Sequence, residues 1–309
     1  MTELNQSRAD AFEPDQVDIA DPDTLALSPP SAPEWRIILK SLMRHRLGSV
    51  GLVVCLIVLV TALFAPLLAP YDPAVSDYEA ILTPPSAEHL LGTDDLGRDI
   101  LSRIIWSSQV SLQVSLIAVS VAIVGGSLVG MISGYAGGWI DDIIMRVVDA
   151  MMAFPSLILA LGIVAVLGPS LTNAMIAIAV VNIPDISRLV RAQVLAVRHM
   201  DFVMAAKGVG AGRVRIMFRH IWPSVAGNVL VYASLSAAGA LITESSLSFL
   251  GLGAQPPTPS WGSMLASGMQ YWNAWWMSVF PGSALFIVAL GFNFVGDGLR
   301  DALDSRIVD

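Results

Sequence analysis

A basic, glycine-containing stretch at residues 201–225 interrupts an otherwise apolar part of the chain. It reads DFVMAAKGVGAGRVRIMFRHIWPSV, with glycines at 208, 210 and 212. Its cations are Lys207, Arg213, Arg215, Arg219 and, if protonated, His220. Clustered cations of this kind bind an acidic surface. The stretch therefore predicts docking onto a partner or a membrane rather than covalent chemistry.

The local sequence of this stretch predicts two helices joined by a turn. Residues 203–207 favour a helix, and the small pair Ala205 and Ala206 lets another surface come near the backbone. Glycines such as Gly210 then allow a turn that residues with a Cβ would resist.

The second predicted helix is amphipathic and held at the membrane surface. Its apolar residues recur at i, i+3, i+4 and i+7, which predicts one buried face made of Val214, Met217, Phe218 and Ile221. Trp222 and Pro223 then mark the membrane interface and the start of the next apolar run.

The familiar signatures of nucleotide binding, hydrolysis and metal binding are absent from the sequence. The two lysines, Lys40 and Lys207, follow Leu39 and Ala206 rather than glycine, so there is no GxxxxGK[ST] phosphate loop. The four histidines show no HExxH spacing, and no GxSxG precedes a helix. One cysteine, Cys55, allows no internal disulfide and suggests no metal cluster. We expect no enzyme activity, no metal and no cofactor bound by this chain.

A few polar residues fall inside apolar runs, where each needs a partner or a water-filled cavity. They are the candidates for a substrate path: Asn182, Asp185, Glu244 and Asn293. Acids at membrane depth are also the usual sign of ion coupling, so a secondary carrier that works alone through Asp185 and Glu244 stays open as an alternative.

The elements that position these residues are membrane spans. Hydrophobic residues make up 55% of the 309 residues and charged residues 14%, against about 25% charged in a soluble domain. A bilayer core needs about 20 apolar residues of helix. Such runs occur at 48–69, 109–134, 144–167, 172–192, 223–250 and 278–298. The sequence predicts an all-α membrane domain of six transmembrane helices over 35–309, with both termini on one side.

The first 34 residues differ sharply from that domain. Residues 1–33 hold seven acids against Arg8 and supply most of the net charge of −8. With few large apolar residues, they cannot build a core. We interpret residues 1–34 as an acidic, disordered cytoplasmic tail.

The distribution of cations predicts the orientation. With both termini in the cytoplasm, fifteen of the seventeen Lys and Arg residues lie inside, and only Arg98 and Arg103 lie outside. That asymmetry satisfies the positive-inside rule. The inner regions then include 201–222, and the outer regions include two long loops, 70–107 and 251–277. The second carries Pro256, Pro257 and four tryptophans, which predict that it folds back along the membrane surface with a short helix.

Gly126, Gly130 and Gly134 form a tandem GxxxG pattern in the second span. Small residues at this spacing let a neighbouring helix approach closely. The pattern predicts packing and no chemistry.

Several stretches resemble one family of transport proteins. Residues Met204 to Gly210, with Trp222 and Pro223 downstream, are similar to the EAAxxxG loop of bacterial ABC importer permeases, with Met204 in place of the family's glutamate. LGTDDLGRD at 91–99, FLGLGAQPPTP at 249–259 and GDGLRDALD at 296–304 are similar to the second permease of dipeptide and oligopeptide importers. Nickel and glutathione permeases resemble the chain in the same places.

The resemblance implies a type I ABC importer permease in the cell inner membrane. Its partners would be a homologous permease, two cytoplasmic ATPase subunits that bind ATP and Mg²⁺, an extracytoplasmic substrate-binding protein and membrane lipid; nucleic acid would not be one. The loop 201–222 would be the coupling helix that docks on an ATPase. The implied docking residues are Ala205, Ala206, Gly210, Arg213, Arg215 and Arg219. The implied contacts with the binding protein are Asp94, Asp95, Arg98, Gln255 and Trp261.

Three readings of the sequence remain open at this point. The first is a permease for short peptides, or for nickel or glutathione. The second is the ion-coupled carrier. The third is a structural membrane subunit whose basic loop lies on anionic lipid.

Overall fold

The computed structural model describes residues 46–304, which belong to one compact unit, Ile38–Asp309. The tail predicted at 1–34 lies outside the described residues. Within them the regular secondary structure is helical, apart from an isolated bridge between Thr93 and Asp99, and loops connect the helices. The helices are α2 (Arg46–Leu63), α3 (Ala65–Leu68), α4 (Ile100–Gln113), η2 (Val114–Ala118), α5 (Val119–Ala136), α6 (Gly138–Met152), α7 (Ser156–Leu167), α8 (Leu171–Val197), α9 (Asp201–Gly208), α10 (Arg213–Arg215), η3 (Ile216–Ile221), α11 (Trp222–Phe249), α12 (Trp261–Gly268) and α13 (Trp276–Asp304).

Five stretches are long and apolar enough to cross a membrane: Arg46–Leu63, Ile100–Ala136, Leu171–Val197, Arg213–Phe249 and Trp276–Leu303. The predicted third span, 144–167, is instead a pair of helices, α6 and α7, that meet at 91°. Pro155 sits at the break, where it supplies no backbone donor and disfavours a helical conformation at Phe154. The described chain thus has five spans, or six if the bent pair counts as one.

Two predicted boundaries are wrong. The first outer loop ends at Asp99 rather than at 107, because the Asp99 side chain accepts a hydrogen bond from the Ser102 backbone and caps α4. The amphipathic segment after Gly212 is not a separate helix. It continues through η3 into α11 as one stretch of 37 residues, Arg213–Phe249.

Close helix packing follows the glycines, as the sequence predicted. A Cβ at Gly130 would lie 2.5 Å from the Ser187 carbonyl oxygen, and one at Gly126 would lie 2.6 Å from the Ile186 Cβ. The tandem GxxxG pattern of α5 therefore packs directly on the backbone of α8.

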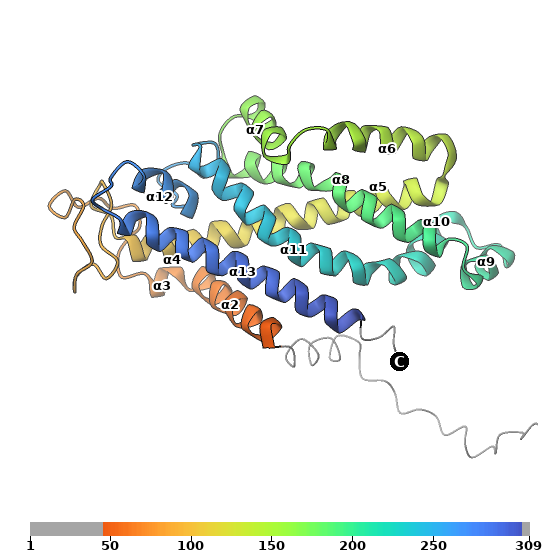
Figure 1. Cartoon of the computed structure of the whole chain (residues 1–309), viewed down its shortest axis with the longest axis horizontal. Helices are drawn as coiled ribbons and strands as arrows, with labels where there is room; N and C mark the ends of the chain where they lie inside the picture. Colours follow the sequence, from red (N-terminus) through yellow and green to blue (C-terminus); the bar gives the residue numbers. More distant parts are fainter. Residues whose placement is uncertain (1–45, 305–309) are drawn as a thin grey trace, which may run out of the picture. The chain divides into compact units, whose positions relative to one another are not determined.

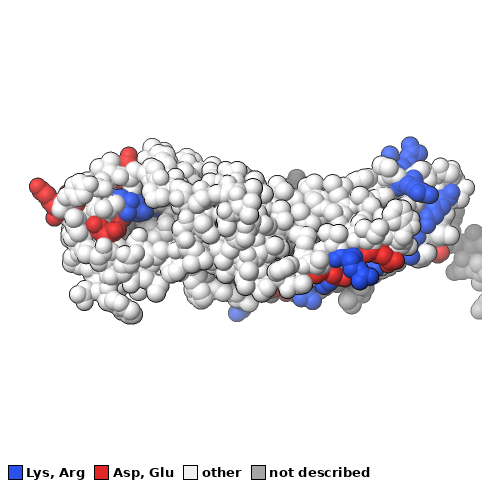
Figure 2. Space-filling model, turned by 90° about the horizontal axis from the view of Figure 1, so that it is seen from above, with Lys and Arg blue, Asp and Glu red and all other residues white. Residues whose placement is uncertain are grey.

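Loops and charges gather at the two ends of the helical bundle. The loop 69–99 and α12 lie at one end, and α9 and α10 lie at the other (Figure 1). After the predicted orientation we call the first the outer end and the second the inner end. Lys, Arg, Asp and Glu side chains gather mainly toward the ends, and the surface between them carries few charged side chains on the face shown (Figure 2). This distribution matches a protein whose middle lies in hydrocarbon. The short helix predicted within 251–277 is present as α12.

Candidate functional site

The turn between α9 and α10 depends on one glycine. The Ala211 amide donates to the Ala206 carbonyl at 3.0 Å, and the Gly210 amide donates to the Lys207 carbonyl at 3.0 Å. This is a Schellman motif, which requires a left-handed residue at the position of Gly210, where φ is +80°. A Cβ at Gly210 would meet nothing within 4 Å, so the glycine is needed for its backbone conformation and not for space.

The small pair splits between the core and the surface. Ala206 is buried at 7% exposure and packs in the same cluster as Val203 and Ile216, whereas Ala205 is exposed. Of the two, only the Ala205 side chain is accessible to a partner. Ala206 fixes α9 onto the rest of the protein.

The predicted apolar face of the second helix is only partly right. Val214 and Phe218 are 68% and 46% exposed, while Ile216 and Ile221 are 1% and 0% exposed. The reason is the π-helical turn at Ile216–Ile221, which aligns residues five apart rather than three or four apart. Pro223, which has no amide donor, follows this turn directly.

The surface of α9, α10 and η3, which we call the inner surface, combines apolar and basic groups. Its exposed apolar side chains include Met204 and Val209, which are 51% and 86% exposed. The exposed Val214 and Phe218 follow within ten residues of Val209. Arg213, Arg215 and Arg219 are also exposed. Within residues 46–304, none of these three arginines forms an ion pair within 4.0 Å. An exposed surface of apolar side chains and unpaired cations fits an interface with an acidic rim.

Two other arginines, expected only as inner-side charges, have a structural role. Arg191 on α8 donates two hydrogen bonds of 2.6 Å to Asp141 on α6, and Arg188, three residues earlier on α8, pairs with Asp149, eight residues later on α6. Ser133 also donates to Asp141. These bonds hold α6 against α5 and α8. The sequence signal was the spacing of Asp141 and Asp149, eight residues apart on one helical face.

The candidate path residues do not form one cluster. Asp185 on α8 is exposed, follows Pro184, and interacts with the Tyr232 hydroxyl of α11. Asn182 donates to the Ile178 carbonyl at 2.7 Å, and Asn293 on α13 is half-buried. Tyr232 on α11 is thus a polar neighbour of Asp185 that sequence reasoning missed.

Glu244 lies apart from Asp185. It is 1% exposed and accepts hydrogen bonds from Ser245 and Ser248. It lies twelve residues beyond Tyr232, or roughly 18 Å along the helix. Ser248 also accepts a bond from the Ala254 amide at 3.0 Å. Glu244 therefore anchors the start of the 251–277 loop, and the two acids form no pair for ion coupling.

The outer end is held together internally. Asp94 is 5% exposed and accepts bonds from the Leu96 and Arg98 amides at 2.9 Å and from the Arg98 Nε at 2.8 Å. Arg103 lies 3.5 Å from Asp94 and donates to the Pro73 carbonyl at 3.0 Å.

Trp261, a second predicted receptor contact, is 3% exposed, and its indole donates to the Ile104 carbonyl at 3.3 Å. Asp94 and Trp261 therefore support these loops from inside. The more accessible predicted residues are Gln255, which is exposed, and Asp95, whose side chain is 27% exposed.

Comparisons with known proteins identify the family of this chain. Residues 126–309, which include the inner surface, match the family described as binding-protein-dependent transport system inner membrane component. Residues 34–85 match the N-terminal TM domain of oligopeptide transport permease C. This chain belongs to that family of inner membrane transport components.

Curated relatives align with the permease over most of its length. A dipeptide transport system permease protein of Alkalihalophilus pseudofirmus is 47% identical over 88% of this chain and 90% of the relative. A di/tripeptide transport system permease protein of Pseudomonas aeruginosa is 45% identical over 85% and 89%. A probable D,D-dipeptide transport system permease protein of Escherichia coli is 46% identical over 82% and 86%.

Family membership confirms the resemblance seen in the sequence. The permease is an inner membrane component and not itself an enzyme. Its family implies a binding protein and ATPase subunits as partners. The reading as a carrier that works alone is therefore disfavoured, both by the family and by the separation of Asp185 from Glu244.

Proposed function

We propose that this permease forms half of the translocation path of an ATP-driven importer of short peptides. The relatives' names refer to dipeptides, di/tripeptides and D,D-dipeptides, which favours peptide cargo over the nickel or glutathione that the resemblance left open. A homologous permease completes the path, and an extracytoplasmic binding protein delivers the peptide. ATP and Mg²⁺ bind to two separate ATPase subunits.

The inner surface is the ATPase docking site in this proposal. The observation that carries it is the unpaired, exposed set Arg213, Arg215 and Arg219 beside exposed apolar side chains. Ala205 and Gly210 lie where a partner can approach the backbone. Ala206 acts indirectly, by holding α9 in place.

The orientation follows from the same charges. With the inner surface in the cytoplasm, both termini lie there as well, and the loops around Asp95 and Gln255 face the binding protein. Residues 1–34 form a cytoplasmic tail and 35–309 the transmembrane domain. In the path, Asn182, Asp185 and Asn293 are the accessible polar candidates, while Glu244 supports the outer loop from inside.

Copurification of ATPase subunits tests the docking site. The full chain would be purified in detergent from native membranes as wild type, Ala205→Trp and Gly210→Trp. Val75→Trp is the matched control, because Val75 is 64% exposed in the outer loop. A bulky side chain at a tightly packed interface costs at least about 1.4 kcal/mol, or tenfold in binding. We expect wild type and Val75→Trp to recover the ATPase and both loop variants to lose at least tenfold. Active transporter recovered without an ATPase would contradict the proposal.

Uptake by the complete system tests the cargo. We expect unlabelled dipeptides to compete with a labelled dipeptide, and nickel ions and glutathione not to compete. Competition by glutathione or nickel at the same concentrations would assign the permease to those cargoes instead, without affecting the docking result.

A further inference from the structure

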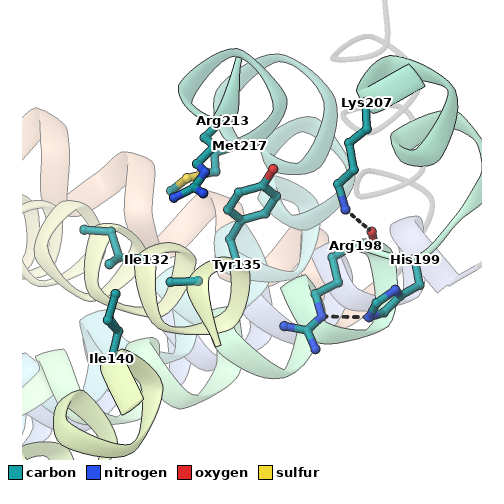
Figure 3. A pocket seen from close by; sticks show the side chains of 9 residues that line it. Ile132, Tyr135, Ile140, Arg198, His199, Lys207, Arg213 and Met217 are labelled. Carbon is teal, nitrogen blue, oxygen red and sulfur yellow. Dashed lines mark hydrogen bonds between the residues drawn. The ribbon is translucent and has the colours of Figure 1, made fainter. Parts of the chain in front are cut away.

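A basic cavity of about 420 Å³ lies at the base of the inner surface. Tyr135 and Ile132 line it from α5, Ile140 from α6, Arg198 from the end of α8, Lys207 from α9 and Arg213 from α10. In Figure 3 the Tyr135 ring lies between the side chains of Arg213 and Lys207, and Ile132 and Ile140 lie together on one side. The cavity therefore has a cationic part and an apolar part.

The charge in this cavity is not balanced within the described residues. No aspartate or glutamate lines it, and no carboxylate of residues 46–304 lies within 4.0 Å of Arg198, Lys207 or Arg213. The Lys207 Nζ lies 5.7 Å from the centre of the Tyr135 ring and 3.4 Å from the Arg198 carbonyl oxygen. Three cations that share one cavity repel one another, and an anion relieves that repulsion.

An apolar groove of about 180 Å³ lies further along α5 toward the middle of the bundle. Val124 and Leu128 line it from α5, and Phe218 and Trp222 from η3 and α11. Val124, Leu128 and Ile132 are spaced by four residues and are 59%, 40% and 45% exposed, so one exposed helical face leads from the groove to the cavity. A cationic cavity followed by an apolar groove fits a molecule with an anionic head and a hydrocarbon tail.

We propose that this cavity binds the phosphate of an anionic phospholipid, with an acyl chain in the groove past Leu128 and Phe218. The phosphate is held by Arg198, Lys207 and Arg213, and the Tyr135 hydroxyl is a further donor beside it. Because these cations lie at the C-terminal end of α8, on α9 and on α10, one bound phosphate joins the three segments. The lipid thus fixes the position of the inner surface relative to the membrane-spanning helices.

The chemistry distinguishes this lipid from other anions. A soluble phosphate satisfies the cations but leaves the apolar groove unused. A carboxylate of an ATPase subunit likewise needs only the cationic part. The experiment must therefore vary the headgroup charge and the acyl chain separately.

Lipid retention by the purified complex tests the proposal. The full chain, with its copurifying subunits, would be titrated with phosphatidylglycerol or phosphatidylcholine, and bound lipid counted by native mass spectrometry. Inorganic phosphate serves as the soluble competitor. The head variant is Lys207→Gln, with Arg146→Gln as its control, because Arg146 is an exposed cation of α6 that neither lines the cavity nor belongs to the inner surface. The tail variant is Leu128→Trp in the apolar groove, with Leu56→Trp as its control, since Leu56 is 57% exposed on α2.

We expect phosphatidylglycerol to be retained in preference to phosphatidylcholine. Lys207→Gln should weaken that retention about fivefold, since one cation near an anionic lipid contributes on the order of a factor of five. Leu128→Trp should weaken it similarly, and neither control should change it.

Three results would overturn the assignment. Equal retention of the two lipids would show that the cavity does not select an anionic headgroup. Displacement by millimolar inorganic phosphate, with no effect of Leu128→Trp, means that a soluble anion occupies the cavity. Unchanged lipid retention by Lys207→Gln together with loss of the ATPase means that the cavity belongs to the protein interface.

Discussion

The two ends of this protein use arginine in opposite ways. At the outer end, Arg98 and Arg103 have side chains only 13% and 7% exposed, and both contact Asp94. At the inner end, Arg213, Arg215 and Arg219 are exposed and have no ion-pair partner among the described residues. A paired, buried charge stabilises the chain's own fold, whereas an unpaired, exposed charge is available to another molecule. The contrast distinguishes a self-contained loop from a docking surface.

The largest expected effect comes from breaking the outer network at its centre. Asp94→Asn should lower the free energy of unfolding by about 3 kcal/mol, because it leaves the buried Arg103 without its counter-charge. Asp95→Asn is the control, since the Asp95 carboxylate lies 3.9 Å from Arg98 and is partly exposed. Heat-induced unfolding of both variants in detergent measures the difference, and equal melting temperatures would contradict the internal role of Asp94.

Two glycines with positive φ, one at each end, allow the stability of the two ends to be compared directly. Gly97 has φ +74°, and a Cβ there would lie 1.7 Å from the Asp77 carbonyl oxygen; Gly210 has φ +80° and open space. Gly97→Ala should therefore cost about 3 kcal/mol, from the backbone strain and the clash, and Gly210→Ala about 1 kcal/mol. The same melting experiment compares them. A larger loss at Gly210 would mean that the inner turn is packed rather than open.

Replacing a single arginine should also lower the stability more at the outer end than at the inner end, but by a smaller amount. Arg98→Gln should lower the stability by about 1 kcal/mol, because it removes a charge-assisted hydrogen bond of a nearly buried pair. Arg215→Gln should leave the melting temperature unchanged while it weakens recovery of the ATPase. A melting temperature lowered equally by both substitutions would show that the inner arginines also hold the fold.

Salt should separate the two ends without any mutation. Raising NaCl from about 0.1 M to about 1 M shortens the Debye length from about 10 Å to about 3 Å. We expect recovery of the ATPase with the chain to fall several-fold, because exposed charges are screened. The melting temperature should change little, because the outer ion pairs are largely buried. An ATPase yield independent of salt would favour a purely apolar interface.

Much of the fold could be predicted from the sequence because a bilayer constrains it strongly. Apolar runs of about 20 residues located five of the spans, and the GxxxG pattern predicted the close contact of α5 with a neighbour. The third run, 144–167, was interpreted as one straight span, since hydropathy does not detect a bend of 91° at Pro155. The register of Arg213–Phe249 was misread for a related reason: periodicity arguments assume α-helical geometry, and η3 is π-helical.

What the sequence alone determined is the class of the protein, a membrane-spanning transport component with a basic loop between two spans. The composition, the cation asymmetry and the glycine-containing motifs are local properties, and reading them requires no distant contacts. Only the tertiary structure decided which side chains in those motifs are available to other molecules. It buried Ala206, Asp94 and Trp261, left Ala205 and Gly210 accessible, and brought Arg198, Lys207 and Arg213 to one cavity. Which side chains are buried, and which cations meet in one cavity, depends on contacts between residues far apart in the chain. The hydrophobicity and spacing of neighbouring residues do not predict those contacts.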